Sequence, residues 1–241
     1  QSDAQTDSGA TADTVADDAS PVDVPEDTAL PPAPACKKGV AYKAGMQAFK
    51  DATNAWGLDG INGARLSVLD YNGDGWPDVL VRQGDGPDEF TQNGKRRRYL
   101  LRNTGKGFVD ATMQSGIFTS RKSATQGGLR GEVLASGDVD NDGDEDVFIA
   151  RAVHNPQDKE YDGETSELVL NQGGGTFELG KAAGDAVMSG KSTVPAGVTL
   201  VDFDRDGNLD LWVTHNMRGG QTSPLQDRLY RGDGTGDFKD V

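Results

Sequence analysis

Short apolar stretches alternate with polar turns along the chain from about residue 60 onward. Three pairs of these stretches flank aspartate-rich segments, and they are rich in valine, isoleucine, leucine and aromatic residues, which is typical of β-strands. The first stretches of the pairs are 66–69, 133–136 and 198–201, and the second are 79–81, 147–150 and 211–214. Each pair therefore predicts two strands joined by a polar loop.

The three loops repeat one pattern, D-x-[DN]-x-D-G-x-x-D, at 70–78, 138–146 and 202–210. Oxygen ligands at positions 1, 3 and 5 converge if the chain curls, the glycine at position 6 permits a sharp turn, and the aspartate at position 9 closes the shell. Without a cation these carboxylates would repel one another. The pattern predicts one calcium ion in each loop. A solvated Asp-Gly hairpin turn is the alternative.

The same first six positions open the calcium loop of an EF-hand, which also needs a glutamate at position 12. Position 12 is occupied here by Val81, Ile149 and Val213, whose side chains cannot bind a metal. The flanking stretches also predict strands where an EF-hand has helices. We therefore expect each loop to join the two strands of a hairpin.

The repetition extends beyond the loops. The patterns begin at Asp70, Asp138 and Asp202, so they are 68 and 64 residues apart. A further apolar stretch, a glycine-rich turn and a segment led by phenylalanine follow each pair, at 99–112, 168–180 and 228–241. Each period thus predicts four short strands, which is typical of a β-propeller blade. The fold class expected is an all-β propeller with about three blades, which must stack on one another.

The three loops, together with the segments 49–53 (Phe-Lys-Asp-Ala-Thr) and 229–241, carry a family resemblance. The chain resembles the FG-GAP/VCBS repeat family over roughly residues 40 to 241, and it is most similar to the repeats of cartilage acidic protein and its bacterial relatives. The resemblance implies a calcium-stabilised propeller, usually seven-bladed, that acts in adhesion or recognition outside the cytoplasm.

The resemblance also implies a ligand set for about three Ca²⁺ sites. In each loop the side chains of positions 1, 3, 5 and 9 and the carbonyl of position 7 would bind the ion. They are Asp70, Asn72, Asp74, Asp78 and the carbonyl of Trp76; Asp138, Asp140, Asp142, Asp146 and the carbonyl of Asp144; and Asp202, Asp204, Asp206, Asp210 and the carbonyl of Asn208. The first loop has three carboxylates where the others have four, so we expect the first site to be the weakest.

Three loops predict fewer blades than a closed ring contains, because propellers close with four to eight. Residues 39–241 are therefore expected to be part of a longer propeller, incomplete at the C-terminus, or to close in another way. Open blades would expose strand edges and favour association.

The first 38 residues differ from the rest in composition. They are rich in Asp, Ala, Thr and Pro, and residues 1–35 contain no Lys or Arg. This predicts a disordered acidic tether. The net charge of −15 argues against binding nucleic acid or an anionic membrane, and no apolar run approaches the roughly 20 residues of a transmembrane helix. A start at Gln1 without a signal core fits a mature secreted or surface protein.

Three inserted segments, 84–98, 153–166 and 216–226, follow the equivalent strand of each repeat and should emerge on one face. Loops grouped on one face of a rigid scaffold usually carry binding specificity. The function predicted is recognition or adhesion, with an extracellular protein or glycan as partner and calcium in a structural role. A portion of a larger secreted enzyme that acts on polysaccharide, or a structural spacer, are the alternatives.

The remaining chemistry is sparse. Two histidines, His154 and His215, are expected in loops, and no nucleophile or zinc motif accompanies them, so the chain is not expected to be an enzyme. Cys36 either pairs with a cysteine outside this sequence or has no partner. The tripeptide Arg231-Gly232-Asp233 is expected on a turn, and the basic run 95–98 on an exposed rim.

Overall fold

The computed structural model describes residues 39, 41, 43–45, 49–82, 98–119, 131–151, 166–181, 195–216 and 226–241. The chain divides into two units, Gln1–Lys50 and Asp51–Val241, and every strand of the described residues belongs to the second. The described residues form strands and turns with a single four-residue helix, so the all-β prediction is confirmed. The predicted tether and Cys36 lie outside the described residues.

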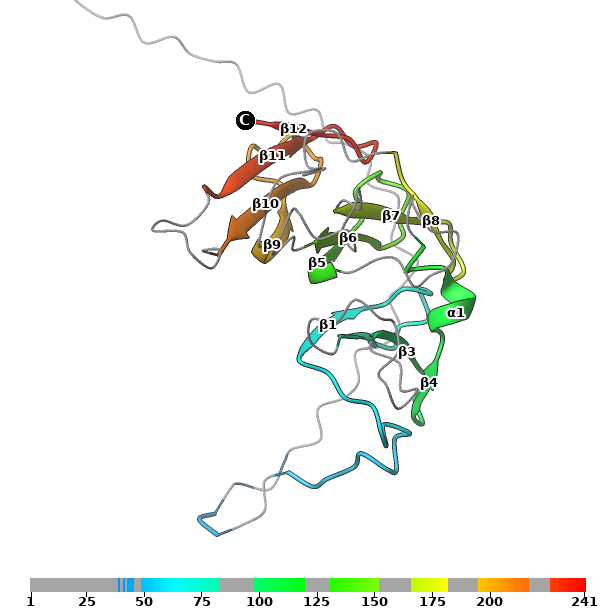
Figure 1. The fold of residues 1–241 in the computed structure, drawn as a ribbon. Coiled ribbons are helices and arrows are strands. Elements are labelled where there is room, and N and C mark those ends of the chain that lie inside the picture. Colours follow the sequence, from blue (N-terminus) through cyan, green and yellow to red (C-terminus); the bar gives the residue numbers. More distant parts are fainter. Residues whose placement is uncertain are drawn as a thin grey trace, which may run out of the picture. The chain divides into compact units, whose positions relative to one another are not determined.

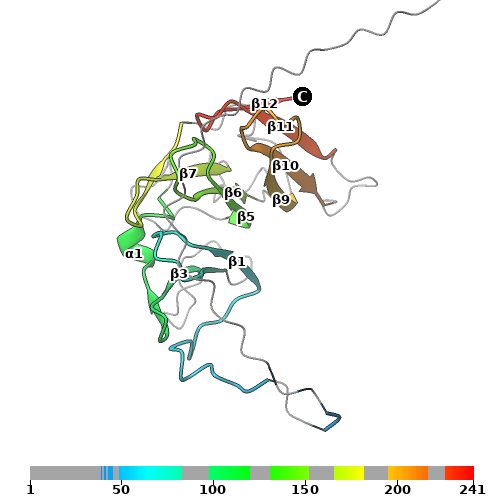
Figure 2. The same cartoon turned by 180° about the vertical axis from the view of Figure 1, so that it is seen from behind.

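Twelve described strands form three antiparallel sheets of four, each in simple chain order (Figures 1 and 2). These sheets are called blades 1, 2 and 3. Blade 1 consists of β1 (Arg65–Leu69), β2 (Asp78–Arg82), β3 (Arg98–Asn103) and β4 (Phe108–Asp110). Blade 2 consists of β5 (Gly131–Gly137), β6 (Asp146–Arg151), β7 (Glu167–Asn171) and β8 (Phe177–Leu179). Blade 3 consists of β9 (Pro195–Val201), β10 (Asp210–His215), β11 (Arg228–Gly232) and β12 (Phe238–Asp240). The four-strand period predicted from the repeats is therefore confirmed.

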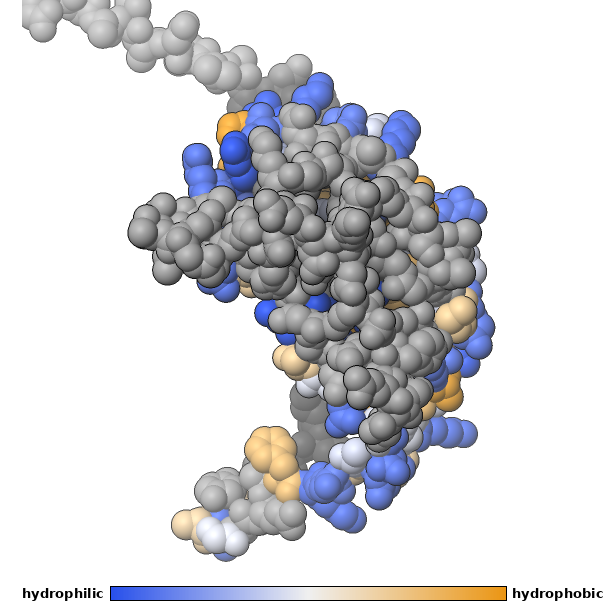
Figure 3. Space-filling view, viewed as in Figure 1, coloured by the Kyte–Doolittle hydropathy of each residue, from blue (hydrophilic) through white to orange (hydrophobic). Residues whose placement is uncertain are grey.

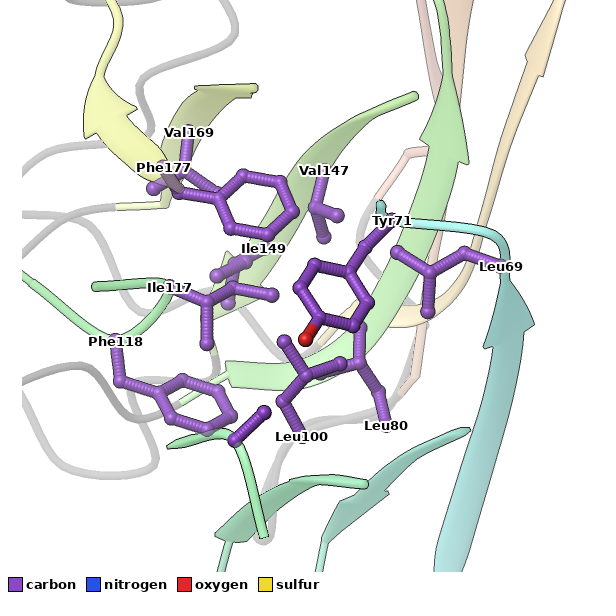
Figure 4. Packing of buried hydrophobic residues seen from close by; sticks show 11 residues of the cluster. Leu69, Tyr71, Leu80, Leu100, Ile117, Phe118, Val147, Ile149, Val169 and Phe177 are labelled. Carbon is purple, nitrogen blue, oxygen red and sulfur yellow. The ribbon is translucent and has the colours of Figure 1, made fainter. Parts of the chain in front are cut away.

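Apolar side chains of neighbouring blades form the core. Between blades 1 and 2, Leu80 and Leu100 pack with Val147 and Ile149 (Figure 4). The helix α1 (Thr112–Ser115) follows blade 1, and its continuation adds Ile117 and Phe118 to this cluster. A second cluster joins blades 2 and 3, where Phe148 and Leu168 meet Leu211, Val213 and Tyr230. Because side chains alternate between the two faces of a strand, blade 2 contributes to both clusters.

The segment that precedes β1 packs on the other face of blade 1. Its Leu58 and Ile61 lie against a cluster that contains Val81 and Leu101. The N–H of Phe108 donates a hydrogen bond of 2.8 Å to the carbonyl of Trp56. This segment therefore covers the outer part of blade 1 with turns and no strand.

The residues at position 12 of the three loops lie inside strands, which confirms that the loops are not EF-hands. Val81, Ile149 and Val213 are all buried. The coloured part of the surface in Figure 3 is mostly hydrophilic, with small apolar patches. No helix within the described ranges is long and apolar enough to span a membrane.

Two sequence expectations are wrong in detail. His215 is the last residue of β10 and is buried, because the strand continues one residue beyond the expected stretch. Arg98, the last residue of the basic run, opens β3 and is only 4% exposed, so it does not belong to an exposed rim. His154 and residues 95–97 lie outside the described residues.

Candidate metal centres

The aspartate at position 1 curls each loop. One carboxylate oxygen of Asp70, Asp138 and Asp202 accepts the N–H of position 5 at 3.1, 3.0 and 3.1 Å. The other oxygen accepts the N–H of the glycine at position 6 at 2.8, 3.0 and 3.1 Å. The loop backbone thus wraps around this carboxylate in all three blades.

Position 6 needs glycine because the chain makes a sharp turn there with a positive φ. Gly75, Gly143 and Gly207 have φ values of 80°, 97° and 90°, which residues with a Cβ rarely adopt. Directly after this turn, the N–H of position 7 donates to the carboxylate of position 5 at 2.9, 3.0 and 2.8 Å. Hydrogen bonds from the loop backbone to the loop's own aspartates therefore hold all three loops in the same shape without the help of an ion.

The aspartate at position 9 connects three parts of its blade. Asp78, Asp146 and Asp210 stand at the start of the second strand and are completely buried. One oxygen accepts the N–H of position 2 in the loop, at 3.3, 2.9 and 2.9 Å. The other accepts an N–H of the third strand, at 2.6, 2.8 and 2.9 Å. This carboxylate thus joins loop, second strand and third strand.

The second and third loops each gather three carboxylates. Oxygen atoms of Asp138, Asp140 and Asp146 all lie within 4.8 Å of one another, and those of Asp202, Asp204 and Asp210 do the same. Among the described residues, these groups leave out the position 5 aspartates, Asp142 and Asp206, whose carboxylates accept hydrogen bonds from the loop backbone. Carboxylate oxygens at this spacing are the donor set that hard cations such as Ca²⁺ take.

The first loop has Asn72 at the centre of the corresponding triad. Its side-chain amide donates a hydrogen bond of 2.9 Å to the carboxylate of Asp74, so the amide nitrogen is directed at a neighbouring ligand candidate. Asp70 and Asp78 hold the same backbone contacts as their counterparts. This loop keeps the shape of the others with one carboxylate fewer.

Burial disfavours the ionised form of the aspartates in the first two loops. Desolvation raises the pKa of Asp78 to about 6 and that of Asp146 to about 7, although backbone N–H groups oppose the rise. Burial and the nearby Asp142 carboxylate also raise the pKa of Asp140. The Oδ1 atom of Asp140 is buried and accepts no hydrogen bond. A buried carboxylate oxygen without a hydrogen-bond donor is suited to bind a cation.

The third loop differs in having a cationic neighbour. The carboxylate of Asp204 forms an ion pair of 2.8 Å with Arg231 of β11, and the guanidinium also lies 6.0 Å from the ring of Phe203. Gly232 donates its N–H to Asp210. Arg231 and Gly232 therefore belong to a strand and contact the loop, so only Asp233 of the tripeptide reaches the turn that was expected for all three.

The third-strand residues at these loops were missed in the sequence. Asn103, Asn171 and Gly232 donate the N–H that holds the position 9 aspartate, and the two asparagines also donate side-chain hydrogen bonds to the end of their own loop. Asn103 and Asn171 each follow the position 9 aspartate of their repeat by 25 residues, and this equal spacing was the available signal.

Comparison with known proteins matches the same segments. Residues 138–213 match the FG-GAP-like repeat model, and residues 62–96 match the FG-GAP repeat model, so all three loops fall within matched segments. Integrin alpha-4 of Xenopus laevis is 36% identical over 102 residues, which are 42% of this chain and 9% of the integrin. The finer resemblance to VCBS and cartilage acidic protein repeats stays a prediction. Over residues 62–96 and 138–213, the repeats of this chain are of the FG-GAP type.

Proposed function

We propose that the chain is a calcium-stabilised recognition module that acts outside the cell and has no catalytic role of its own. The observation that carries the calcium proposal is the triad of Asp138, Asp140 and Asp146, with its buried, donor-free Oδ1 atom on Asp140. The same triad recurs in the third loop, and the first loop repeats its backbone geometry.

Calcium would act on structure in this proposal. An ion in the triad contacts position 9, which already binds the loop and the third strand through backbone N–H groups. Neutralising the buried carboxylates removes their mutual repulsion and their desolvation penalty. The ion would therefore hold the hairpin and the third strand together. It would also fix the far ends of the second and third strands, which the inserted segments connect.

The recognition face would lie at the opposite ends of these strands. A cavity of about 350 Å³ opens there, and all three blades line it, with Arg65, Ser67 and Arg82 from blade 1, Val133 and Leu134 from blade 2 and 196–198 from blade 3. Its size is in the range of small-ligand sites, and arginine beside apolar side chains suits carboxylate or sulfate groups of proteins and glycans. The inserted segments themselves lie outside the described residues.

An extracellular location is part of the same proposal. The similarity of 102 residues to integrin alpha-4 supports it. Calcium loops of low affinity are also saturated at the millimolar calcium outside cells.

Thermal unfolding with and without calcium tests the proposal. The midpoint should rise with calcium concentration and fall on addition of a chelator, because a ligand that binds only the folded state stabilises it. Magnesium at equal concentration is the control, since its smaller octahedral shell fits a flexible carboxylate loop poorly. A midpoint that calcium and chelator leave unchanged would refute the calcium proposal. A glycan and matrix-protein array probed with the calcium-loaded chain tests recognition separately.

A further inference from the structure

One position of the third strand has a side-chain partner in blades 2 and 3 but, among the described residues, none in blade 1. It directly precedes the residue whose N–H binds the position 9 aspartate, and it is Arg102 in β3, Leu170 in β7 and Arg231 in β11. Leu170 packs in the cluster between blades 2 and 3. Arg231 forms its ion pair of 2.8 Å with Asp204.

Arg102 lacks the carboxylate that Arg231 binds. The loop residue at the position of Asp204 is Asn72 in blade 1, and its amide carries no charge. Within the ranges that the structure describes, the guanidinium of Arg102 forms no ion pair and donates no hydrogen bond. Arg102 is also exposed, so a ligand can reach it. Blade 1 therefore presents a cation whose counterpart in blade 3 is neutralised.

This guanidinium lines a cavity of about 360 Å³ between blades 1 and 2, at the end of the blades where the aspartate-rich loops lie. Its walls include Tyr71 of the first loop, Gln114 of α1 and the turn 174–176 between β7 and β8. Between blades 2 and 3 the corresponding turn meets leucine, since a Cβ added to Gly236 would lie 3.7 Å from a methyl carbon of Leu170. The cavity thus lies where the repeats exchange a packed leucine for an exposed arginine.

Asp110 also lines the cavity, but its carboxylate does not pair with Arg102. The Oδ1 atom of Asp110 accepts the N–H of Thr112 at 2.9 Å. Val109 is the cross-strand partner of Arg102, and side chains alternate along β4, so the Asp110 side chain leaves from the opposite face of the strand. The cavity therefore keeps a positive side at Arg102.

We propose that this cavity binds an acidic sugar unit, a hexuronate, through its carboxylate. The ligand carboxylate would pair with Arg102 in the way that Asp204 pairs with Arg231. A planar guanidinium matches the two oxygens of a carboxylate, and an ion pair of this kind carries charge-assisted hydrogen bonds.

The rest of the lining suits a sugar ring. The amide of Gln114 and the carboxylate of Asp110 offer donors and acceptors to hydroxyl groups, and Val109 offers an apolar surface to the C–H groups. The volume is at the low end of small-ligand sites, which fits a single ring. The site lies apart from the recognition face proposed above and contains no candidate calcium ligand, so the two proposals can fail independently.

NMR titration of the isotope-labelled chain with methyl hexuronosides tests the proposal. The amide signals of Gly174 and Gly175 and the Nε–H signal of Arg102 should shift together, with a dissociation constant on the order of 1 mM for a ligand of this size. Neutral methyl hexosides of the same ring configuration should bind about tenfold more weakly or worse, because they lose the charge-assisted hydrogen bonds.

Two variants separate the site from general charge effects. Arg102→Leu carries the residue that blade 2 has at this position and should lower the affinity about tenfold or more. Lys106→Gln is the matched control, because Lys106 is exposed in the same blade, loses the same charge and does not line the cavity. It should bind as the wild type does, and the dispersion of the NMR spectra verifies that both variants fold.

Absence of hexuronoside binding, or equal affinity of Arg102→Leu and the wild type, would overturn the site. Succinate, a carboxylate without a sugar ring, identifies the ligand class. Equally tight binding of succinate would overturn the sugar as the ligand.

Discussion

The side-chain amide of Asn171 in β7 donates a hydrogen bond of 2.7 Å to the backbone carbonyl oxygen of Tyr71, in the aspartate-rich loop of the neighbouring blade. Asn171 is only 1% exposed, so water does not replace this bond. The same amide donates a longer bond of 3.3 Å to Glu145 in its own loop. One side chain therefore couples the loop ends of blades 1 and 2.

Substitution of Asn171 should weaken this coupling. Asn171→Leu leaves the buried carbonyl of Tyr71 without its donor, and we expect a loss of about 1–3 kcal/mol in the free energy of unfolding. Urea unfolding measures it. Asn103→Leu is the control, because the Asn103 amide binds Pro77 in its own blade. If Asn171→Leu unfolds as cooperatively and as late as the wild type, the bond has no role in joining the blades.

The turn between β7 and β8 also lies close to Tyr71, and two of its glycines offer a matched pair. Gly174 and Gly175 both have positive φ, at 63° and 85°. A Cβ on Gly174 would meet nothing within 4 Å, but one on Gly175 would lie 2.6 Å from Cε2 of Tyr71. Gly174→Ala should cost about 1–2 kcal/mol for backbone strain alone. Gly175→Ala should cost clearly more, as measured by thermal unfolding, and equal losses would contradict the close approach.

The position 9 and position 3 aspartates should respond differently to chelation. Asp146 accepts two buried backbone hydrogen bonds, whereas Oδ1 of Asp140 accepts none. In chelator, Asp146→Ala should therefore lower the free energy of unfolding by about 2–4 kcal/mol, because two N–H groups lose their acceptor. Asp140→Ala should change it little under the same conditions, and both variants should lose stabilisation by calcium. A large loss for Asp140→Ala in chelator would mean that this residue has a structural role of its own.

The first loop should bind calcium more weakly than the other two, since Asn72 replaces a carboxylate. Asn72→Asp removes the amide directed at Asp74 and adds a charge, so we expect higher affinity at this site. Calorimetric titration of the wild type and the variant measures the change. Three equal affinities in the wild type would refute the ranking.

His215 should make stability depend on pH. Burial lowers its pKa, although the neighbouring Asp227 carboxylate opposes the shift. The folded state therefore binds the proton less readily than the unfolded state, so the histidine disfavours folding increasingly as pH falls below about 6.5. The stability of the wild type relative to His215→Gln should decrease between pH 8 and pH 5. A constant difference would show that the imidazole does not titrate in this range.

Much of the site was predictable because it is local. Positions 1, 5, 6 and 7 of each loop contact one another within a few residues, so their spacing alone specifies the curl. The role of Asn171 was not predictable, because its partner is the carbonyl of Tyr71 one hundred residues away. The burial of Arg98 and His215 was missed for another reason. Both lie at the ends of strands, where polar residues follow the apolar stretch and the alternating pattern no longer indicates which side chains are buried.

The sequence by itself determined the loops, the four-strand period and the β class, because each depends on spacing within one repeat. The tertiary structure decided how the repeats use their faces. Leu80, Phe148 and Trp212 occupy the same repeat position, yet the first two are buried and the third is half exposed. Blade 2 covers Leu80 and blade 3 covers Phe148, whereas no described blade packs over Trp212. Burial against a neighbour is a property of the assembled sheets that no single repeat contains.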